Sequence, residues 1–158
     1  MRLYLVQHGA ALDKQEDPAR ALSRQGIQEV TLMAKALGDA GVRVERVWHS
    51  GKRRAEQSAT LLASQLMPEG TIEWVTGIDP LDPVQEFVAD ADVWLEDTLV
   101  VGHMPFLSRL VSLLLCGEPD RELVSYLPGS VVCLERGSAG QWTLLWMLRP
   151  ELHGETVT

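Results

Sequence analysis

Cysteine is rare in this sequence of 158 residues, and no apolar run approaches the roughly 18 residues that cross a membrane. The two cysteines, Cys116 and Cys133, lie in apolar surroundings without the spacing of a metal site, which indicates two reduced thiols in the core. The N-terminus leads directly into an apolar stretch, without the features of a signal peptide. We therefore expect a cytoplasmic protein that does not associate with membranes.

Positive charge is scarce too. The sequence has 14 lysines and arginines against 22 aspartates and glutamates, a formal net charge of −8. A chain this acidic is a poor general binder of nucleic acid or of anionic lipid, so we expect neither as a partner. An anion-binding site in it must gather a few positive groups locally. The share of hydrophobic residues, 46%, is that of a globular domain.

Internal repeats, linkers and low-complexity segments are also missing, which favours a single domain over residues 1–148, followed by a polar tail over residues 149–158. Within the domain, apolar strand-like segments alternate with amphipathic helical ones. Helices are predicted to begin near residues 24, 51, 83 and 105, and strands to cover residues 1–6, 42–48, 71–75, 98–102, 130–135 and 141–147. This alternation predicts a three-layer α/β/α fold with a mostly parallel, six-stranded sheet.

Three of these helices follow a residue type that favours the N-cap position, namely Ser23, Ser50 and Asp82. Apolar residues recur at helical spacing in the first helix, which predicts a buried face made of Ile27, Val30, Ala34 and Leu37. We expect this face to pack against the sheet.

Two histidines and an arginine fall at the ends of predicted elements. His8 ends the first strand, His103 ends the fourth strand, and Arg54 lies in the first turn of the helix after the second strand. Ligands in α/β folds of this kind bind beyond the carboxyl ends of the strands, so we expect the three side chains to meet there. Together with helix N-termini they form a site for an anion, and phosphate is the natural candidate.

The residue types indicate how such a site reacts with a phosphoryl group. A neutral imidazole attacks phosphorus and forms a phosphohistidine intermediate, while a second, charged imidazole binds an oxygen in the transition state. The sequence has no cluster of carboxylates or of cysteines and histidines at metal-site spacing, so we expect neither a metal nor another cofactor.

Four motifs in order make the chain resemble the histidine phosphatase superfamily (phosphoglycerate mutase-like), and within it the small SixA-type phosphohistidine phosphatases. They are Val6-Gln7-His8-Gly9, Leu22-Ser23-Arg24-Gln25-Gly26, Ser50-Gly51-Lys52-Arg53-Arg54-Ala55-Glu56-Gln57-Ser58 and Val101-Gly102-His103-Met104-Pro105. The resemblance covers nearly the whole chain and shows no inserted helical lid. It implies a phosphoglycerate mutase-like fold and phosphatase activity.

The resemblance also implies a role for each matching residue. His8 would be the nucleophile, and Arg54 and His103 would bind the phosphoryl group. Arg20, in the polar loop over residues 9–22, matches a basic position of SixA-like proteins and would contact the substrate. The motif selects Arg54 over its neighbours Lys52 and Arg53, which otherwise belong to a solvated helix start.

Gln7 departs from the family pattern, which has an arginine there that clamps the phosphoryl group. The amide donates hydrogen bonds but carries no charge. The loss of the arginine's charge is expected to slow turnover by about tenfold to a few hundredfold. Three interpretations stay open. The enzyme works with a weaker clamp, it uses Lys52, Arg53 or Arg20 instead, or it has become a module that binds phosphorylated ligands.

The general acid is predicted from the region after the third strand, where larger members of the superfamily have a carboxylate. Asp79, Asp82 and Glu86 lie in that region. Asp82 is already explained as a helix cap, so Asp79 is the candidate, with Glu16 and Asp17 of the first loop as alternatives.

The sequence therefore predicts a metal-independent phosphatase that removes phosphate from phosphohistidine on a partner protein. The missing lid leaves an open, shallow crevice, which suits a protein surface better than a small molecule. A phosphatase of small phosphorylated substrates and a catalytically silent binding module are the alternatives.

Overall fold

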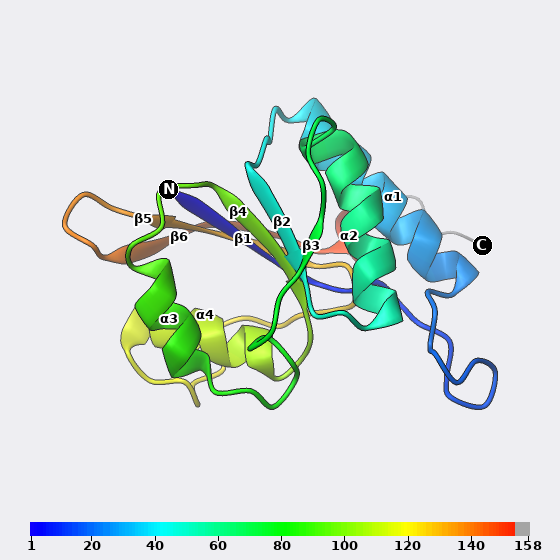
Figure 1. Ribbon diagram of the computed structural model, residues 1–158. Coiled ribbons are helices and arrows are strands. Elements are labelled where there is room, and N and C mark those ends of the chain that lie inside the picture. The colour runs from blue at the N-terminus through cyan, green and yellow to red at the C-terminus, as the bar shows by residue number, and fades with distance from the viewer. Residues whose placement is uncertain (154–158) are drawn as a thin grey trace.

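Six strands form one sheet between two layers of helices in the computed structural model, which describes residues 1–153 (Figure 1). The strands are β1 (Arg2–Gln7), β2 (Arg46–His49), β3 (Glu73–Trp74), β4 (Thr98–Gly102), β5 (Val131–Arg136) and β6 (Trp142–Leu148). The helices are α1 (Arg24–Asp39), α2 (Arg53–Leu66), α3 (Val84–Ala91) and α4 (Phe106–Cys116), with a 3₁₀ turn η1 (Pro150–His153). The predicted three-layer α/β/α fold is confirmed.

The strand order is β3-β2-β4-β1-β5-β6. Strands β3, β2, β4 and β1 run parallel, β5 runs antiparallel to β1, and β6 runs antiparallel to β5. Helices α1 and α2 cover one face, and α3 and α4 cover the other (Figure 1). Along β1, Tyr4 and Val6 enter the first core while Leu3 and Leu5 enter the second. Because β1 is buried on both faces, its sequence is a continuous apolar run instead of an alternating one.

Helix α1 matches its prediction except on one turn. The hydroxyl of Ser23 accepts the N–H of Gly26 and caps the helix as expected. Ile27, however, is 43% exposed, so its predicted place in the core is wrong, and Met33 is buried instead. Residues three or four apart can belong to either of two neighbouring stripes on the surface of a helix. The stripe that packs against the sheet in α1 is the one that contains Met33.

The other two predicted caps are wrong. Helix α2 begins at Arg53, behind Lys52, and the hydroxyl of Ser50 contacts His103 instead of a helix amide. In α3, Pro83 takes the N-cap position in an extended conformation. The carboxylate of Asp82 therefore accepts the N–H of Asp79 and closes a turn before the helix.

One smaller expectation is also wrong. Cys133 is buried, but Cys116 is exposed, because it ends α4 just before the left-handed turn at Gly117. The first part of the expected polar tail forms η1, which contacts α1. Residues 154–158 of that tail lie outside the described residues. Within residues 1–153, no helix is both long and apolar enough to span a membrane.

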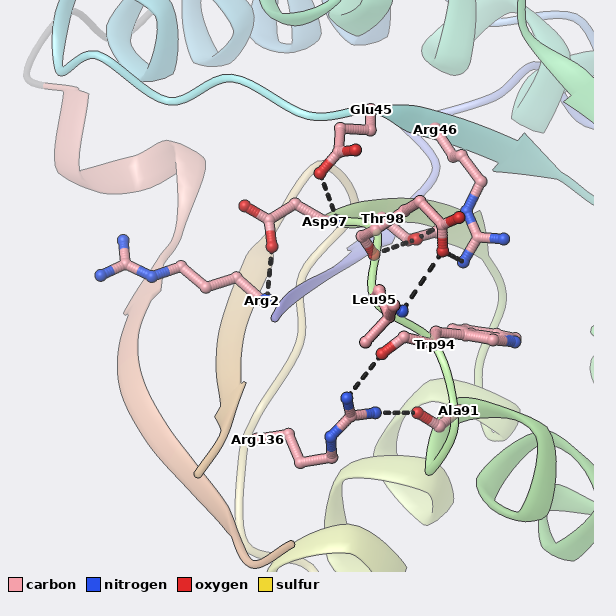
Figure 2. A network of polar contacts seen from close by, with 10 residues as sticks. Arg2, Glu45, Arg46, Ala91, Trp94, Leu95, Asp97, Thr98 and Arg136 are labelled. Carbon is pink, nitrogen blue, oxygen red and sulfur yellow. Dashed lines mark hydrogen bonds and ion pairs between the residues drawn. The ribbon is translucent and has the colours of Figure 1, made fainter. Parts of the chain in front are cut away.

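A network of polar contacts holds the turn between α3 and β4 (Figure 2). The guanidinium of Arg136 donates to the carbonyls of Ala91 and Trp94, each at 2.6 Å. The carboxylate of Asp97 accepts the N–H of Arg2 at 2.7 Å. These contacts fix the amino ends of β1 and β4, and so set the register in which their opposite ends reach the candidate site.

Candidate active site

His8 and His103 meet at the carboxyl ends of two adjacent parallel strands. Gln7, the last residue of β1, lies opposite Gly102, the last residue of β4, so the next residue of each strand stands at the same height. The N–H of His8 donates to the carbonyl of Gly102 at 3.1 Å. The ring centroids of the two histidines are 5.0 Å apart. The sheet therefore brings together two residues that are far apart in the sequence.

The hydrogen bonds of His8 fix its tautomer. Its Nδ1 lies 2.7 Å from the carbonyl oxygen of Gly9, which accepts a proton and has none to give. The Nε–H of Arg54 points to Nε2 of His8 at 3.3 Å. Nδ1 thus carries the proton and Nε2 carries a lone pair. Burial, together with the nearby charge of Arg54, lowers the pKa of His8 to about 4, so this imidazole is neutral at neutral pH.

His103 is more deeply buried, with 2% of its surface exposed. Its Nε2 lies 2.6 Å from the hydroxyl of Ser50, while its Nδ1 is buried and has no hydrogen-bond partner. Burial, together with the neighbouring His8 and Arg54, lowers the pKa of His103 to about 3. In the absence of a ligand this imidazole is therefore neutral at neutral pH, and its charged form in the transition state stays a prediction. A bound anion would favour the protonated form, because opposite charge raises the pKa of a base.

The three basic residues at the start of α2 separate in space. Arg54 lines the pocket at the strand ends. Lys52 lies 3.9 Å from the carboxylate of Asp79, and Arg53 lies 3.9 Å from that of Glu56. Of the three, Arg54 alone is among the described residues that line the pocket, and its Nε–H points to Nε2 of His8.

The pocket around these side chains has a volume of about 430 Å³. Its walls include Gln7, His8, Arg20, Arg54, Pro80 and His103. The Oε1 atom of Gln7, an acceptor, is buried without a hydrogen-bond partner. An anion in this pocket would lie beside the guanidinium groups of Arg20 and Arg54.

Arg20 reaches the pocket from a strained point of the first loop. Its φ of 51° is in the left-handed region. The carboxylate of Asp17 holds this turn by accepting the N–H groups of Ala19 and Ala21. The side chain of Arg20 is itself tied to the carbonyl of Leu12 at 3.1 Å. Asp17 therefore positions Arg20.

No aspartate or glutamate is among the described residues that line the pocket. Asp79, the predicted acid, is exposed and faces Lys52, although its neighbour Pro80 is part of the pocket wall. The structure places Asp79 near the mouth of the pocket and not within it. Within residues 1–153, no group of three or more histidine, cysteine, aspartate or glutamate residues is arranged to hold a metal ion.

Sequence reasoning missed the residues that attach the first loop to α2. The hydroxyl of Ser58 accepts the N–H of Gly9 at 3.0 Å and donates to the carbonyl of Arg54 at 2.8 Å. The side chain of Gln57 accepts the N–H of Leu22 at 2.7 Å. Ser58 could have been recognised in the sequence, because it is a polar residue within the otherwise apolar stripe that α2 buries.

The fold and this pocket define a protein of the phosphoglycerate mutase-like histidine phosphatase class. The chain is 30% identical to the phosphohistidine phosphatase SixA of Escherichia coli (strain K12) over 155 residues, which cover 95% of this chain and 94% of that protein. It therefore belongs to the histidine phosphatase superfamily, SixA type, and is a phosphatase. No family model matches the chain.

Solved structures agree with this assignment. The structure of the protein histidine phosphatase SixA complexed with tungstate superimposes with a TM-score of 0.85 at 26% identity, covering 97% of this chain and 99% of that one. The α-ribazole phosphatase from Shigella flexneri has the same fold, with a TM-score of 0.77 at 16% identity over 95% of this chain and 97% of that one. The sequence-based identification of the family is confirmed.

Proposed function

We propose that this protein removes the phosphoryl group from phosphohistidine on a partner protein, without a metal, through a covalent intermediate on His8. The observation that carries the proposal is the hydrogen bond from Nδ1 of His8 to the carbonyl of Gly9. It leaves the lone pair on Nε2, next to Arg54. A neutral imidazole held in that tautomer is ready to attack phosphorus without first losing a proton.

The reaction has two transfers. In the first, Nε2 of His8 forms a bond to phosphorus, the bond from phosphorus to the substrate nitrogen breaks, and the leaving imidazole takes up a proton. In the second, water attacks phosphorus, the bond to Nε2 breaks, and inorganic phosphate leaves. Arg54, Arg20 and Gln7 bind the phosphoryl oxygens, and His103 binds one through its unpartnered Nδ1.

Asp79 is the acid that we propose for protonating the leaving group. Its position beside Pro80, a wall of the pocket, supports this role. An imidazole leaves readily once protonated, whereas an alkoxide needs an acid more. Asp79→Asn is therefore expected to slow the hydrolysis of an alkyl phosphate more than that of phosphohistidine.

The partner protein is proposed as the substrate for two reasons. The relative from Escherichia coli is a phosphohistidine phosphatase by name, and the chain matches it over nearly its full length. The pocket wall also includes side chains from loops, such as Arg20 and Pro80, with no inserted domain among the described residues to cover it. Gln7 supports a second candidate, a module that binds phosphorylated ligands, since its uncharged side chain stands in the pocket.

A trapping experiment tests the nucleophile. The protein is mixed with a histidine-phosphorylated protein carrying ³²P and quenched in base, which preserves phosphohistidine. We expect label on the wild type and none on His8→Ala. Label that persists on His8→Ala contradicts the proposed nucleophile.

Phosphate release separates the two candidate functions. An aryl phosphate and a histidine-phosphorylated protein are assayed with the wild type and with Gln7→Arg. Release by the wild type from the phosphorylated protein supports the phosphatase. If the wild type releases no phosphate and Gln7→Arg does, the binding module is the better description.

A further inference from the structure

A second pocket, of about 600 Å³, is lined by residues of β2, β3 and α3 and by the segment that follows β3. Its walls include three tryptophans, Trp48, Trp74 and Trp94, with Phe87 and two carboxylates, Glu86 and Asp90. None of these residues lines the pocket of His8. This tryptophan pocket has no part in the chemistry proposed above.

Three of the aromatic walls pack against one another. Trp94 packs edge-to-face against Trp48, with ring centroids 4.8 Å apart, and against Phe87 at 5.2 Å. Trp74 is 71% exposed, so its indole forms an open side of the pocket. Indoles present π faces that attract cations.

Arg46 shows that these indoles accept a guanidinium. Its guanidinium carbon lies 4.4 Å from the ring centroid of Trp48 and 4.8 Å from that of Trp94. Figure 2 shows this guanidinium next to the Trp94 side chain. Arg46 is not among the residues that line the tryptophan pocket. The pocket therefore offers aromatic surface in addition to what Arg46 already covers.

Two carboxylates stand beside these rings without a cation of their own. Glu86 and Asp90 are four residues apart on α3, which places them on one face of the helix. Neither forms an ion pair with any residue in the described part of the chain. Aromatic rings next to two free carboxylates favour an organic cation and repel an anion.

The tryptophan pocket borders the pocket of His8. Ile78 lines the first and Pro80 lines the second, so their Cα atoms are separated by at most about 7 Å of chain. The indole of Trp74 covers Gly51, which follows Ser50, the partner of His103. One protein bound across this segment can reach both pockets.

We propose that the tryptophan pocket binds an arginine or lysine side chain of the protein that carries the phosphohistidine. This inference rests on the proposed function and adds a second point of attachment to it. The phosphoryl group enters the pocket of His8, while the basic side chain lies against the indoles and faces Glu86 and Asp90. Specificity then depends on basic residues near the phosphohistidine.

Matched peptides test this proposal. Each peptide contains one phosphohistidine, and they differ only in having arginine or glutamine at the same positions on both sides of it. We expect the wild type to prefer the arginine peptide by about tenfold in kcat/KM, the scale of one cation–π contact with a neighbouring carboxylate. Glu86→Gln/Asp90→Asn is expected to lose this preference and to hydrolyse an aryl phosphate at the wild-type rate.

Two controls separate the pocket from the general acidity of the chain. Glu69→Gln/Glu122→Gln removes two exposed charges elsewhere and is expected to keep the preference. Trp74→Phe, which keeps a π face, is expected to keep more of it than Trp74→Ala. Equal kcat/KM for the two peptides in the wild type, or an equal loss in both double variants, overturns the pocket's role.

Failure of the proposed function has a different signature. A wild type that hydrolyses neither peptide overturns that function and the docking role with it. Titration with N-acetyl-arginine amide, monitored by indole fluorescence, measures binding to the tryptophan pocket independently of hydrolysis. A probe that binds the wild type and Glu86→Gln/Asp90→Asn equally well contradicts the cation site, whatever the kinetics show.

Discussion

The rings of His8 and His103 lie with their centroids 5.0 Å apart and their planes inclined by 51°. Both imidazoles are held neutral, since burial lowers the pKa of His8 to about 4 and that of His103 to about 3. One neutral imidazole is what a nucleophile requires. The other becomes a cation only when negative charge arrives beside it, so the pair couples ligand binding to proton uptake.

This coupling predicts a loss of stability on acidification. The folded-state pKa of His103 is below the value of about 6.5 for an unfolded histidine, so the unfolded chain takes up the proton first as pH falls. The stabilisation is complete above about pH 6.5 and is lost progressively down to the folded-state pKa. At about pH 5 we expect the free energy of unfolding to fall by about 1–2 kcal/mol on account of His103.

Urea unfolding at about pH 7 and about pH 5 measures this effect. His103→Gln is expected to lose about 1–2 kcal/mol less between the two pH values than the wild type does. The comparison uses the difference between pH values, so any general cost of the substitution cancels. An identical pH dependence in both proteins contradicts the neutral, buried His103.

Ser50 is predicted to position His103. Its hydroxyl lies 2.6 Å from Nε2, and Ser50→Ala leaves this buried nitrogen without a partner. We expect kcat/KM to fall by about tenfold to a hundredfold, the cost of a misoriented transition-state ligand. Ser50→Thr, which keeps the hydroxyl, should recover most of the activity.

Ser64→Ala is the matched control for Ser50→Ala. Ser64 is exposed on α2, and its hydroxyl donates only to the carbonyl of Leu61. Its removal should leave kcat/KM unchanged. If Ser50 served stability alone, Ser50→Ala would lower the free energy of unfolding. It would leave kcat/KM and the pKa of His103, measured by NMR titration, unchanged.

The sequence predicted the layers of the fold and the positions of His8, Arg54 and His103, because both depend on local pattern. Apolar runs mark buried strands wherever they occur, and the residues after them reach the same edge of a parallel sheet. The strand ends could therefore be placed before the strand order was known.

Contacts that depend on tertiary structure could not be predicted in this way. Ser50 and Ser23 are both serines just before a helix, but the hydroxyl of Ser50 contacts His103 whereas that of Ser23 accepts the N–H of Gly26 in α1. Asp82 looked like a cap because Pro83 permits a helix to start there, and its actual partner is a turn amide. The distance from Asp79 to the pocket depends on the course of a loop, which no local pattern fixes.

Ser58 is predicted to hold Gly9, and with it the loop that carries Arg20. Ser58→Ala removes the acceptor of the buried N–H of Gly9 and is expected to cost about 1–3 kcal/mol in the free energy of unfolding. Thr60→Ala is the control, since Thr60 also donates to the carbonyl four residues earlier but is exposed. Urea unfolding should show a change below about 0.5 kcal/mol for Thr60→Ala. Equal losses for the two variants would refute the role of Ser58.

Two glycines of α1 are predicted to respond to alanine with opposite signs. A Cβ at Gly26 would lie 2.9 Å from the carbonyl carbon of Ala10 and closer still to its oxygen, where backbone cannot yield cheaply. Ala10 lines the pocket of His8, so Gly26→Ala has to move the loop away from the site. We expect a loss of about 1–3 kcal/mol in the free energy of unfolding, together with lower kcat/KM.

At Gly38 the same substitution meets no such obstacle. The nearest atom to a Cβ there is Cβ of Gln65 at 3.5 Å, an ordinary contact. Gly38→Ala should raise the free energy of unfolding by about 0.5 kcal/mol, because alanine loses less backbone entropy in a helix, and it should leave kcat/KM unchanged. Since both residues lie in α1, a rise in the free energy of unfolding for both variants would mean that helix propensity, and not the contact with Ala10, governs the role of Gly26.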